Sequence, residues 1–133
     1  MNVLFEEDGH FRAGSVMTDS VSSLQVELPS GKRSKVKAAN VLLRFASPDP
    51  AALLAAAEVQ AADLDATFLW DVCGDDEFPF EELAREYHGA APTAEQAAAI
   101  LLCLHAAPVY FHRKGKGRFR KAPPDILKAA LAG

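Results

Sequence analysis

The chain has 133 residues, of which 50% are hydrophobic and 24% are charged, and its formal net charge is −4. This length suits one compact unit or two very small ones. The sequence has no run of about 18 apolar residues that would span a membrane, and its first residues lack the basic start and apolar core of a signal peptide. Its two cysteines, Cys73 and Cys103, form no CxxC motif, so we expect a cytoplasmic protein with reduced thiols and no membrane partner.

The charge is distributed unevenly along the chain. Residues 46–108 carry one basic residue, Arg85, against twelve acidic ones. Residues 109–121, in contrast, carry six basic residues and no acidic one. A small basic segment on an acidic body is a focused electrostatic site. Residues 109–121 are therefore the first place to look for a function.

The first 45 residues are predicted to form strands, because short apolar and β-branched segments alternate there with turn signals. In "LQVEL", Leu24, Val26 and Leu28 alternate with polar residues, which is the period of a half-buried strand. Short strands at this density predict a small antiparallel β-barrel, SH3-like or OB-like, over residues 1–46. The expected strands are "NVLF", "FRAGSVM", "LQVEL", "KRSKVK" and "NVLLRF".

The pattern changes from strand to helix after this predicted barrel. Pro50 suits a first helical turn, and the alanine-rich segment that follows it strongly favours helix. The sequence leaves open whether residues 50–73 form one helix or two. We expect residues 47–64 to be a helical connector, with residues 1–45 and 65–133 forming separate cores.

Two further helices are expected in "FPFEELAREYHG" and "PTAEQAAAILLCLHAAP". In the second, Thr93 and Gln96 have the spacing of a capping box, and Gly89 before it is a helix stop. The apolar face of the first, at helical spacing, is expected to comprise Phe80, Leu83, Ala84 and Tyr87.

The basic segment is predicted to be a β-hairpin. "VYFHRKG" and "GRFRKAP" resemble two strands, and the glycines of "KGKG" between them allow a turn. A short helix in "PPDILKAALAG" follows. Helices followed by a basic hairpin are in the order of a winged helix, with the hairpin at 109–121 projecting as the wing from a three-helix core. The predicted fold class is therefore α+β, a small N-terminal barrel followed by a winged-helix (helix-turn-helix) domain at 65–133.

The basic hairpin has two interpretations. Positive charge can simply keep an exposed strand edge soluble. Six cations without a balancing acid, interleaved with Tyr110, Phe111 and Phe119, favour instead a phosphate-binding wing whose aromatic rings stack on unpaired bases. The nucleic-acid contacts expected here are Tyr110, His112, Arg113, Lys114, Lys116, Arg118, Arg120 and Lys121.

A second basic stretch, "GKRSKVK", lies at the predicted edge of the barrel. Strand alternation would place Arg33, Lys35 and Lys37 on one face. A polar outer face on a half-exposed strand explains this pattern at least as well as a binding function does. As candidates for nucleic-acid contact we include Lys32, Arg33, Lys35 and Lys37.

The remaining motifs do not point to catalysis or to sequence-specific DNA binding. The helix that would enter a DNA groove offers Glu95 and Gln96 and then mostly alanine and leucine, so it is poorly equipped to contact base edges. Cys103 and His105 are two residues apart on a helix and point apart, and no cysteine spacing suits zinc. We predict no catalytic residue, no metal ligand and no cofactor in this chain.

The order of the predicted elements and several segments of the sequence resemble those of a known family. The segments "DEFPFEELAREYHG", "PTAEQAAAILLCLHAAP" and, most specifically, "YFHRKGKGRFRKAP" resemble the N-terminal region of bacterial RNB-family exoribonucleases of the RNase II/R type, in the subgroup with a winged helix. The resemblance covers essentially the whole chain. It implies processive 3′-to-5′ hydrolysis of single-stranded RNA by a catalytic RNB domain, whose clustered aspartates hold Mg²⁺.

That catalytic domain would follow residue 133, so we expect this chain to be the accessory RNA-binding portion without the enzyme. Its expected partners are single-stranded RNA and the RNB domain of the same full-length protein. Two alternatives remain open. The acidic helical face of residues 46–108 could dock a basic protein partner, or the chain could be a DNA-binding winged helix.

Overall fold

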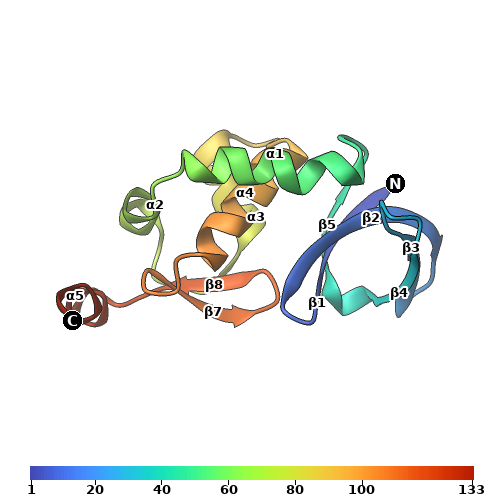
Figure 1. Ribbon diagram of the computed structural model, residues 1–133. Helices are drawn as coiled ribbons and strands as arrows, with labels where there is room; N and C mark the ends of the chain where they lie inside the picture. Colours follow the sequence, from blue (N-terminus) through green and yellow to red (C-terminus); the bar gives the residue numbers. More distant parts are fainter.

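A computed structural model describes residues 1–133 and has mixed α+β architecture, with five α-helices and two antiparallel sheets. This confirms the predicted α+β class. The larger sheet lies at one end of the molecule, and the helices and the smaller sheet lie at the other (Figure 1). No helix is long and apolar enough to cross a membrane.

The larger sheet contains five strands in the order β4-β3-β2-β1-β5. The five predicted strands are all present, but the sheet is not a closed barrel, because β4 and β5 are its two edges and do not pair with each other. A short 3-10 turn, Ala38–Asn40, carries the chain from β4 at one edge to β5 at the other. The strands are β1 Asn2–Glu7, β2 His10–Asp19, β3 Ser23–Glu27, β4 Arg33–Lys37 and β5 Val41–Phe45.

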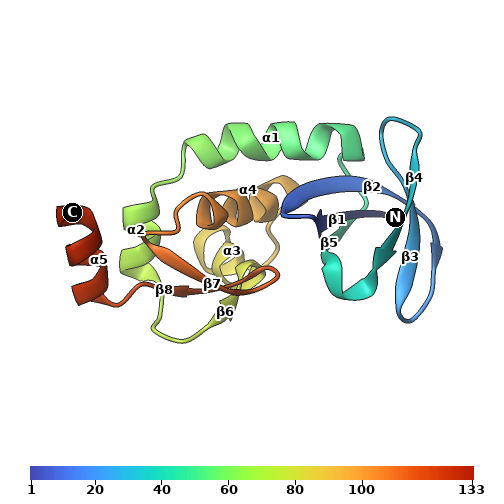
Figure 2. The ribbon, with the colours of Figure 1, turned by 60° about the horizontal axis from the view of Figure 1, so that its bottom comes forward.

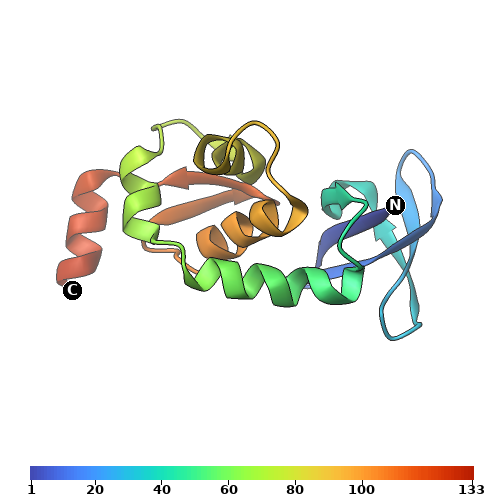
Figure 3. The same ribbon diagram turned by 90° about the horizontal axis from the view of Figure 1, so that it is seen from above.

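Residues 50–73, for which one helix or two were possible, form two helices. Helix α1, Pro50–Ala62, starts with proline in its first turn, and helix α2, Ala66–Val72, follows after a short break. The side chain of Asp65 caps α2 by accepting hydrogen bonds from the backbone N–H groups of Thr67 and Phe68. Helix α1 packs along α4 and extends from the larger sheet to α2 (Figure 3).

Helices α3, Phe80–His88, and α4, Ala94–His105, follow the predicted signals. Gly89 ends α3 with φ +110°, and Thr93 and Gln96 form the predicted capping box of α4. Of the four residues predicted to form the apolar face of α3, Phe80, Leu83 and Ala84 are buried and Tyr87 is not. It lies in the last turn, is 42% exposed and packs edge-on against the ring of Phe68 of α2.

The smaller sheet joins the C-terminal hairpin to a strand that the sequence did not predict. Strands β7, Phe111–Gly115, and β8, Arg118–Lys121, form the predicted hairpin. A two-residue strand, β6, Phe78–Pro79, pairs with β8 and gives the order β6-β8-β7. Helix α5, Pro124–Ala132, ends the chain.

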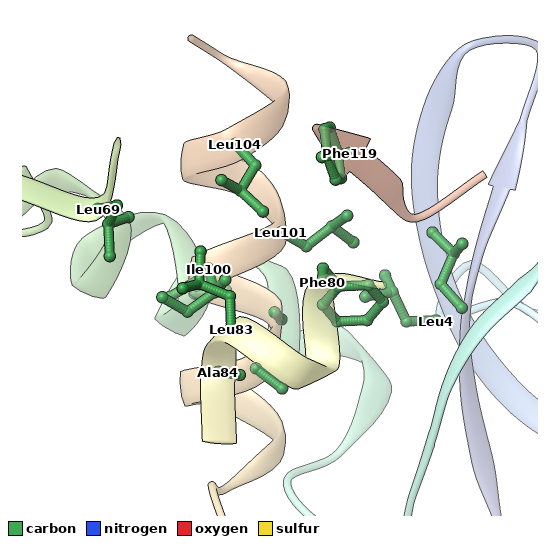
Figure 4. Close-up of a cluster of buried hydrophobic side chains, with 14 of the residues drawn as sticks. Leu4, Leu69, Phe80, Leu83, Ala84, Ile100, Leu101, Leu104 and Phe119 are labelled. Atoms are coloured by element: carbon green, nitrogen blue, oxygen red, sulfur yellow. The ribbon is translucent and has the colours of Figure 1, made fainter. Parts of the chain in front are cut away.

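The hydrophobic side chains form two clusters. The smaller one contains five buried residues, all from the larger sheet, including Val3 and Phe5. The larger one has 20 buried residues and joins Leu4, on the opposite face of the same strand, to the helices and to β8 (Figure 4). The larger sheet also contributes Ala13, Leu42 and Phe45 to this cluster.

The expectation of separate cores for residues 1–45 and 65–133 is therefore wrong. Strand β1 alternates between the two clusters, and the larger cluster crosses the boundary near residue 46. The domain limits at 1–46, 47–64 and 65–133 stay a prediction.

The shared core predicts that a cavity in the larger sheet destabilises the helices. Leu4→Ala removes a fully buried side chain and should lower the free energy of unfolding by about 2–4 kcal/mol. Trp70, the only tryptophan, lies in α2 and reports on the helical part by fluorescence, while far-UV circular dichroism reports on the whole chain. Both midpoints in urea should fall together, and an unchanged Trp70 midpoint would show that the sheet unfolds independently.

Candidate nucleic-acid interface

The basic hairpin lies against the rest of the molecule and does not project into solvent. Its turn points toward the larger sheet (Figures 1 and 2). Gly117, at φ +70°, is buried in that turn, and a Cβ atom there would lie 3.1 Å from Cδ2 of Leu42 and 3.2 Å from Cδ1 of Phe80. The backbone N–H of Phe80 donates to the Gly117 carbonyl at 2.9 Å. The prediction of a projecting wing is wrong because glycine allows the turn to approach both β5 and α3 this closely.

The aromatic residues of the hairpin serve mainly to anchor it. Phe111 and Phe119 are 1% and 2% exposed and belong to the larger hydrophobic cluster, so the base-stacking role expected for them is wrong. Tyr110 is half-buried, and its hydroxyl oxygen accepts a hydrogen bond from the Thr67 hydroxyl at 3.1 Å. Strand alternation turns Phe111 and Phe119 toward the core, and it turns the residues next to them along each strand outward.

Arg113 is the cation that ties the hairpin to the larger sheet. Its guanidinium donates to the carboxylate of Glu6 at 2.7 Å. The Glu6 side chain is only 4% exposed, and that of Arg113 is 42% exposed. A buried carboxylate needs a partner of this kind, because an uncompensated buried charge costs several kcal/mol. Arg113 is therefore primarily a structural cation.

Two further arginines contact the acidic loop that precedes β6. Arg118 forms an ion pair with Glu77, and both side chains are more than 40% exposed. Nε of Arg120 donates to the backbone carbonyl of Asp75 at 2.9 Å. Both arginines lie on the exposed face of β8, since Phe119 between them is buried. Because exposed ion pairs contribute only about 0–1 kcal/mol, a phosphate can replace Glu77 at little cost.

Lys121 is held by the helical part. Its ammonium lies 4.1 Å from the ring centroid of Trp70 and donates to the Cys73 carbonyl at 3.1 Å. The indole N–H of Trp70 in turn donates to the Ala122 carbonyl at 2.8 Å. Lys121 is half-buried and fastens the end of β8 to α2, so it offers little to an external ligand.

Of the remaining predicted residues of the hairpin, the two lysines lie near its turn and His112 lies near its base. Lys114 and Lys116 are exposed and form neither an ion pair nor a side-chain hydrogen bond. His112 is half-buried and pairs across the hairpin with Arg120. The hairpin therefore presents five exposed cations, of which the two lysines are unpaired, and they are Arg113, Lys114, Lys116, Arg118 and Arg120.

The second basic stretch follows strand alternation as predicted. Lys32, Arg33, Lys35 and Lys37 are all exposed, whereas Val36 is buried. None of the four basic side chains forms an ion pair. Arg33, Lys35 and Lys37 lie on an edge strand, β4, and Lys32 directly precedes it, where lysine also protects a sheet from pairing with other chains.

The sequence did not identify the acidic partners of the hairpin. Glu6 is 107 residues from Arg113, and only its alternation with Leu4 on β1 could have placed it on the face toward the helices. Asp75 and Glu77 reach the arginines because β6 pairs with β8. That strand is two residues long and contains Pro79, so no strand pattern marks it.

No constellation suited to nucleophilic or metal chemistry is present. Burial raises the pKa of the Cys73 thiol to about 11, and the carboxylates of Glu86, Glu82 and Asp75 add to this effect against the opposing charge of Lys121. Burial also raises the pKa of Cys103, with a smaller contribution from Asp65. Both thiols therefore stay protonated at neutral pH and are poor nucleophiles. No group of three or more His, Cys, Asp or Glu side chains is placed to hold a metal ion.

Comparison with known proteins gave no match to a family model, to a curated protein or to a solved structure. The case for a nucleic-acid interface therefore rests on the geometry of the hairpin in this chain.

The different surroundings of the arginines predict different effects on stability. Arg113→Ala leaves the Glu6 carboxylate buried without a partner and should lower the free energy of unfolding by about 2–3 kcal/mol. Arg118→Ala, whose partner is exposed, should lower it by less than about 1 kcal/mol. Urea unfolding measures both. Adding Glu6→Gln to Arg113→Ala should recover part of the loss, and equal effects of the two single substitutions would contradict the structural role of Arg113.

Proposed function

We propose that this chain binds single-stranded RNA through the exposed face of the β7–β8 hairpin, as an accessory region of an RNase II/R-type 3′-to-5′ exoribonuclease. The observation that carries the proposal is the division of the hairpin into an inner and an outer face. Phe111, Phe119 and the Arg113–Glu6 pair fasten the inner face to the rest of the molecule, while Arg118 and Arg120 stand on the outer face and Lys114 and Lys116 stand near the turn, all four exposed. Phosphate contacts of this kind supply affinity for nucleic acid without selecting a sequence.

A winged-helix arrangement of residues 65–133 is part of the proposal. It is supported by the order α2, β6, α3, α4 and hairpin, and by the three-stranded sheet in which β8 lies between β6 and β7. In this arrangement α3 and α4 form the helix-turn-helix, and β7 and β8 form the wing. The open five-stranded sheet, with its short strands and 3-10 turn, takes the place of the small SH3-like or OB-like barrel.

The surroundings of α4 favour RNA over specific DNA sequences. A DNA-reading helix needs side chains that are able to reach base edges. The side-chain oxygen of Gln96 instead accepts the Thr93 N–H at 2.9 Å in the capping box. Six of the 12 residues of the helix are buried, including Ala97 and Leu104, and no Lys or Arg lies on it. Non-specific contact by the hairpin is therefore the better account.

The cations of β4 provide a second, independent surface for the same RNA. Lys32, Arg33, Lys35 and Lys37 are exposed and unpaired, so they would add affinity if a strand of RNA were long enough to reach them. In the proposed full-length protein, both surfaces would deliver RNA to the catalytic RNB domain, which supplies the Mg²⁺-dependent hydrolysis.

The first test is the dependence of RNA binding on salt. If Lys114, Lys116, Arg118 and Arg120 contact phosphates, log affinity for labelled single-stranded RNA should fall against log salt with a slope of roughly −3. Substituting Ala for both Lys114 and Lys116 should flatten the slope by about 1.4 and weaken all sequences alike. Fluorescence anisotropy measures this.

The matched control removes two cations from the other surface, with Ala at both Lys32 and Lys35. This control variant has the same net charge as the hairpin variant, so a general effect of net charge on RNA binding would be equal in the two variants. If the control flattens the slope more than the hairpin variant does, the main contact lies on β4. If neither variant changes binding, or if the chain does not bind RNA at low salt, the proposal is wrong.

The second test concerns the acidic loop as a competitor of RNA. Glu77→Gln removes the charge that pairs with Arg118 and keeps the shape of the side chain. RNA affinity at low salt should rise about twofold to fivefold, the range of an exposed ion pair. Asp76→Asn is the control, because Asp76 is exposed, adjacent and in no ion pair. An equal gain from both variants would show that only net charge matters and that the pairing does not.

A further inference from the structure

An apolar groove opens on the face formed by the C-terminal halves of α1 and α4. Its volume is about 520 Å³, and nine of its eleven lining residues are hydrophobic. Phe11, at the start of β2, closes one end and packs edge-on against the ring of His105 at 4.8 Å between centroids. The groove shares no residue with the basic hairpin, although the carbonyl of its lining residue Ala107 accepts hydrogen bonds from the backbone N–H groups of Tyr110 and Phe111. Other lining residues are Ala61, Ala62, Leu64, Leu102 and Ala106.

The groove exists because its walls carry short side chains. Alanines 61 and 62 end α1, and alanines 106 and 107 follow α4, so nothing reaches across the space where the two helices part. Larger side chains on either wall would have filled it and joined the core. The exposed side of α1 is also uncharged apart from Glu58, which is unusual for a helix in a chain with 24% charged residues.

Apart from His105, the polar groups around the groove are acidic. Glu58 is the only carboxylate in the lining, it is exposed, and it forms no ion pair. Asp63 and Asp65 flank the lining residue Leu64, and neither forms an ion pair. The Asp65 carboxylate caps α2, and after burial it is the second cause of the raised pKa of Cys103 in the lining. The only basic residue of residues 46–108, Arg85, does not line the groove.

We propose that this groove docks a protein segment that inserts large apolar side chains, such as leucine, and flanks them with lysine or arginine. The apolar lining accepts the side chains, and the carboxylates of Glu58 and Asp63, which form no ion pair, accept the cations. The same carboxylates repel phosphate, so neither RNA nor an anionic lipid surface fits this site. The proposal does not depend on RNA binding by the hairpin.

A designed peptide provides the probe. It has about 14 residues, with leucine at helical spacing on one face and lysine elsewhere. Titrated into ¹⁵N-labelled chain, it should shift the amide signals of Ala62, Leu102 and Ala106 at submillimolar concentration. The matched peptide with glutamate in place of lysine should produce no shift at the same concentration.

Variants of the chain locate the site. Ala62→Trp fills the groove from an exposed position and should abolish the shifts, whereas Ala52→Trp, exposed on the same helix but outside the lining, should keep them. Glu58→Gln should weaken the lysine peptide about twofold to fivefold. Dispersed amide spectra establish that each variant is folded.

Three results would overturn the proposal. They are binding of the glutamate peptide as strong as that of the lysine peptide, shifts confined to residues outside the groove, and no shift with the lysine peptide at millimolar concentration. A loss of RNA binding in the hairpin variants would leave this result unchanged, so the two proposals fail separately.

Discussion

Strand β1 is buried on both faces, and the arrangement of the rest of the molecule depends on this. Val3 and Phe5 point into the small cluster of the larger sheet, while Leu4 and Glu6 point toward the helices. A strand in this position cannot be exposed on either side without leaving apolar area in water, at about 25 cal/mol per Å². Strand β1, together with Ala13 of β2 and with Leu42 and Phe45 of β5, therefore fixes the sheet and the helical part relative to each other.

The position of Glu6 on β1 determines how the basic hairpin can act. A carboxylate on the buried face must be neutralised by a partner, and Arg113 takes that role at 2.7 Å. Together with the close approach of Gly117 to Leu42 and Phe80, this pair holds the turn against the sheet. The backbone of the hairpin is thus held in place against the sheet and α3. The side chains of Lys114 and Lys116 form no ion pair or hydrogen bond, so a ligand that contacted them would order these two lysines as well as its own chain.

The sequence was most informative where a local pattern decides the structure. Strand alternation, the capping box of Thr93 and Gln96, the stop at Gly89 and the glycine turn of the hairpin were all predictable, because each depends on neighbours in the chain. Period and composition also predicted the five strands of the larger sheet, though not its openness. Closure requires hydrogen bonds between strands β4 and β5, which no local signal specifies.

Contacts between distant segments were not predictable in this way. No residue close to the hairpin in the sequence indicates that Glu6, Asp75 and Glu77 lie beside its arginines. Residues 109–121 were therefore interpreted as six positive charges without acidic partners. The burial of Phe111 and Phe119 was missed for a related reason. An aromatic ring between cations is equally consistent with a base-stacking platform and with a core anchor. The face that it occupies decides between them, and that face depends on how the hairpin docks.

The acidic composition of the chain and its basic hairpin are parts of one electrostatic arrangement. Carboxylates near the hairpin reduce its net charge, so it does not hold a polyanion by an unopposed cluster of cations. The pair of Arg118 and Glu77 is exposed and costs little to open, whereas the pair of Arg113 and Glu6 is partly buried and stays closed. In the proposed interaction, binding would exchange one weak surface ion pair for a phosphate contact and would leave the docked hairpin intact. Such sequence-independent contacts would allow a nucleic acid to slide, which would suit a surface that guides a strand rather than one that retains it.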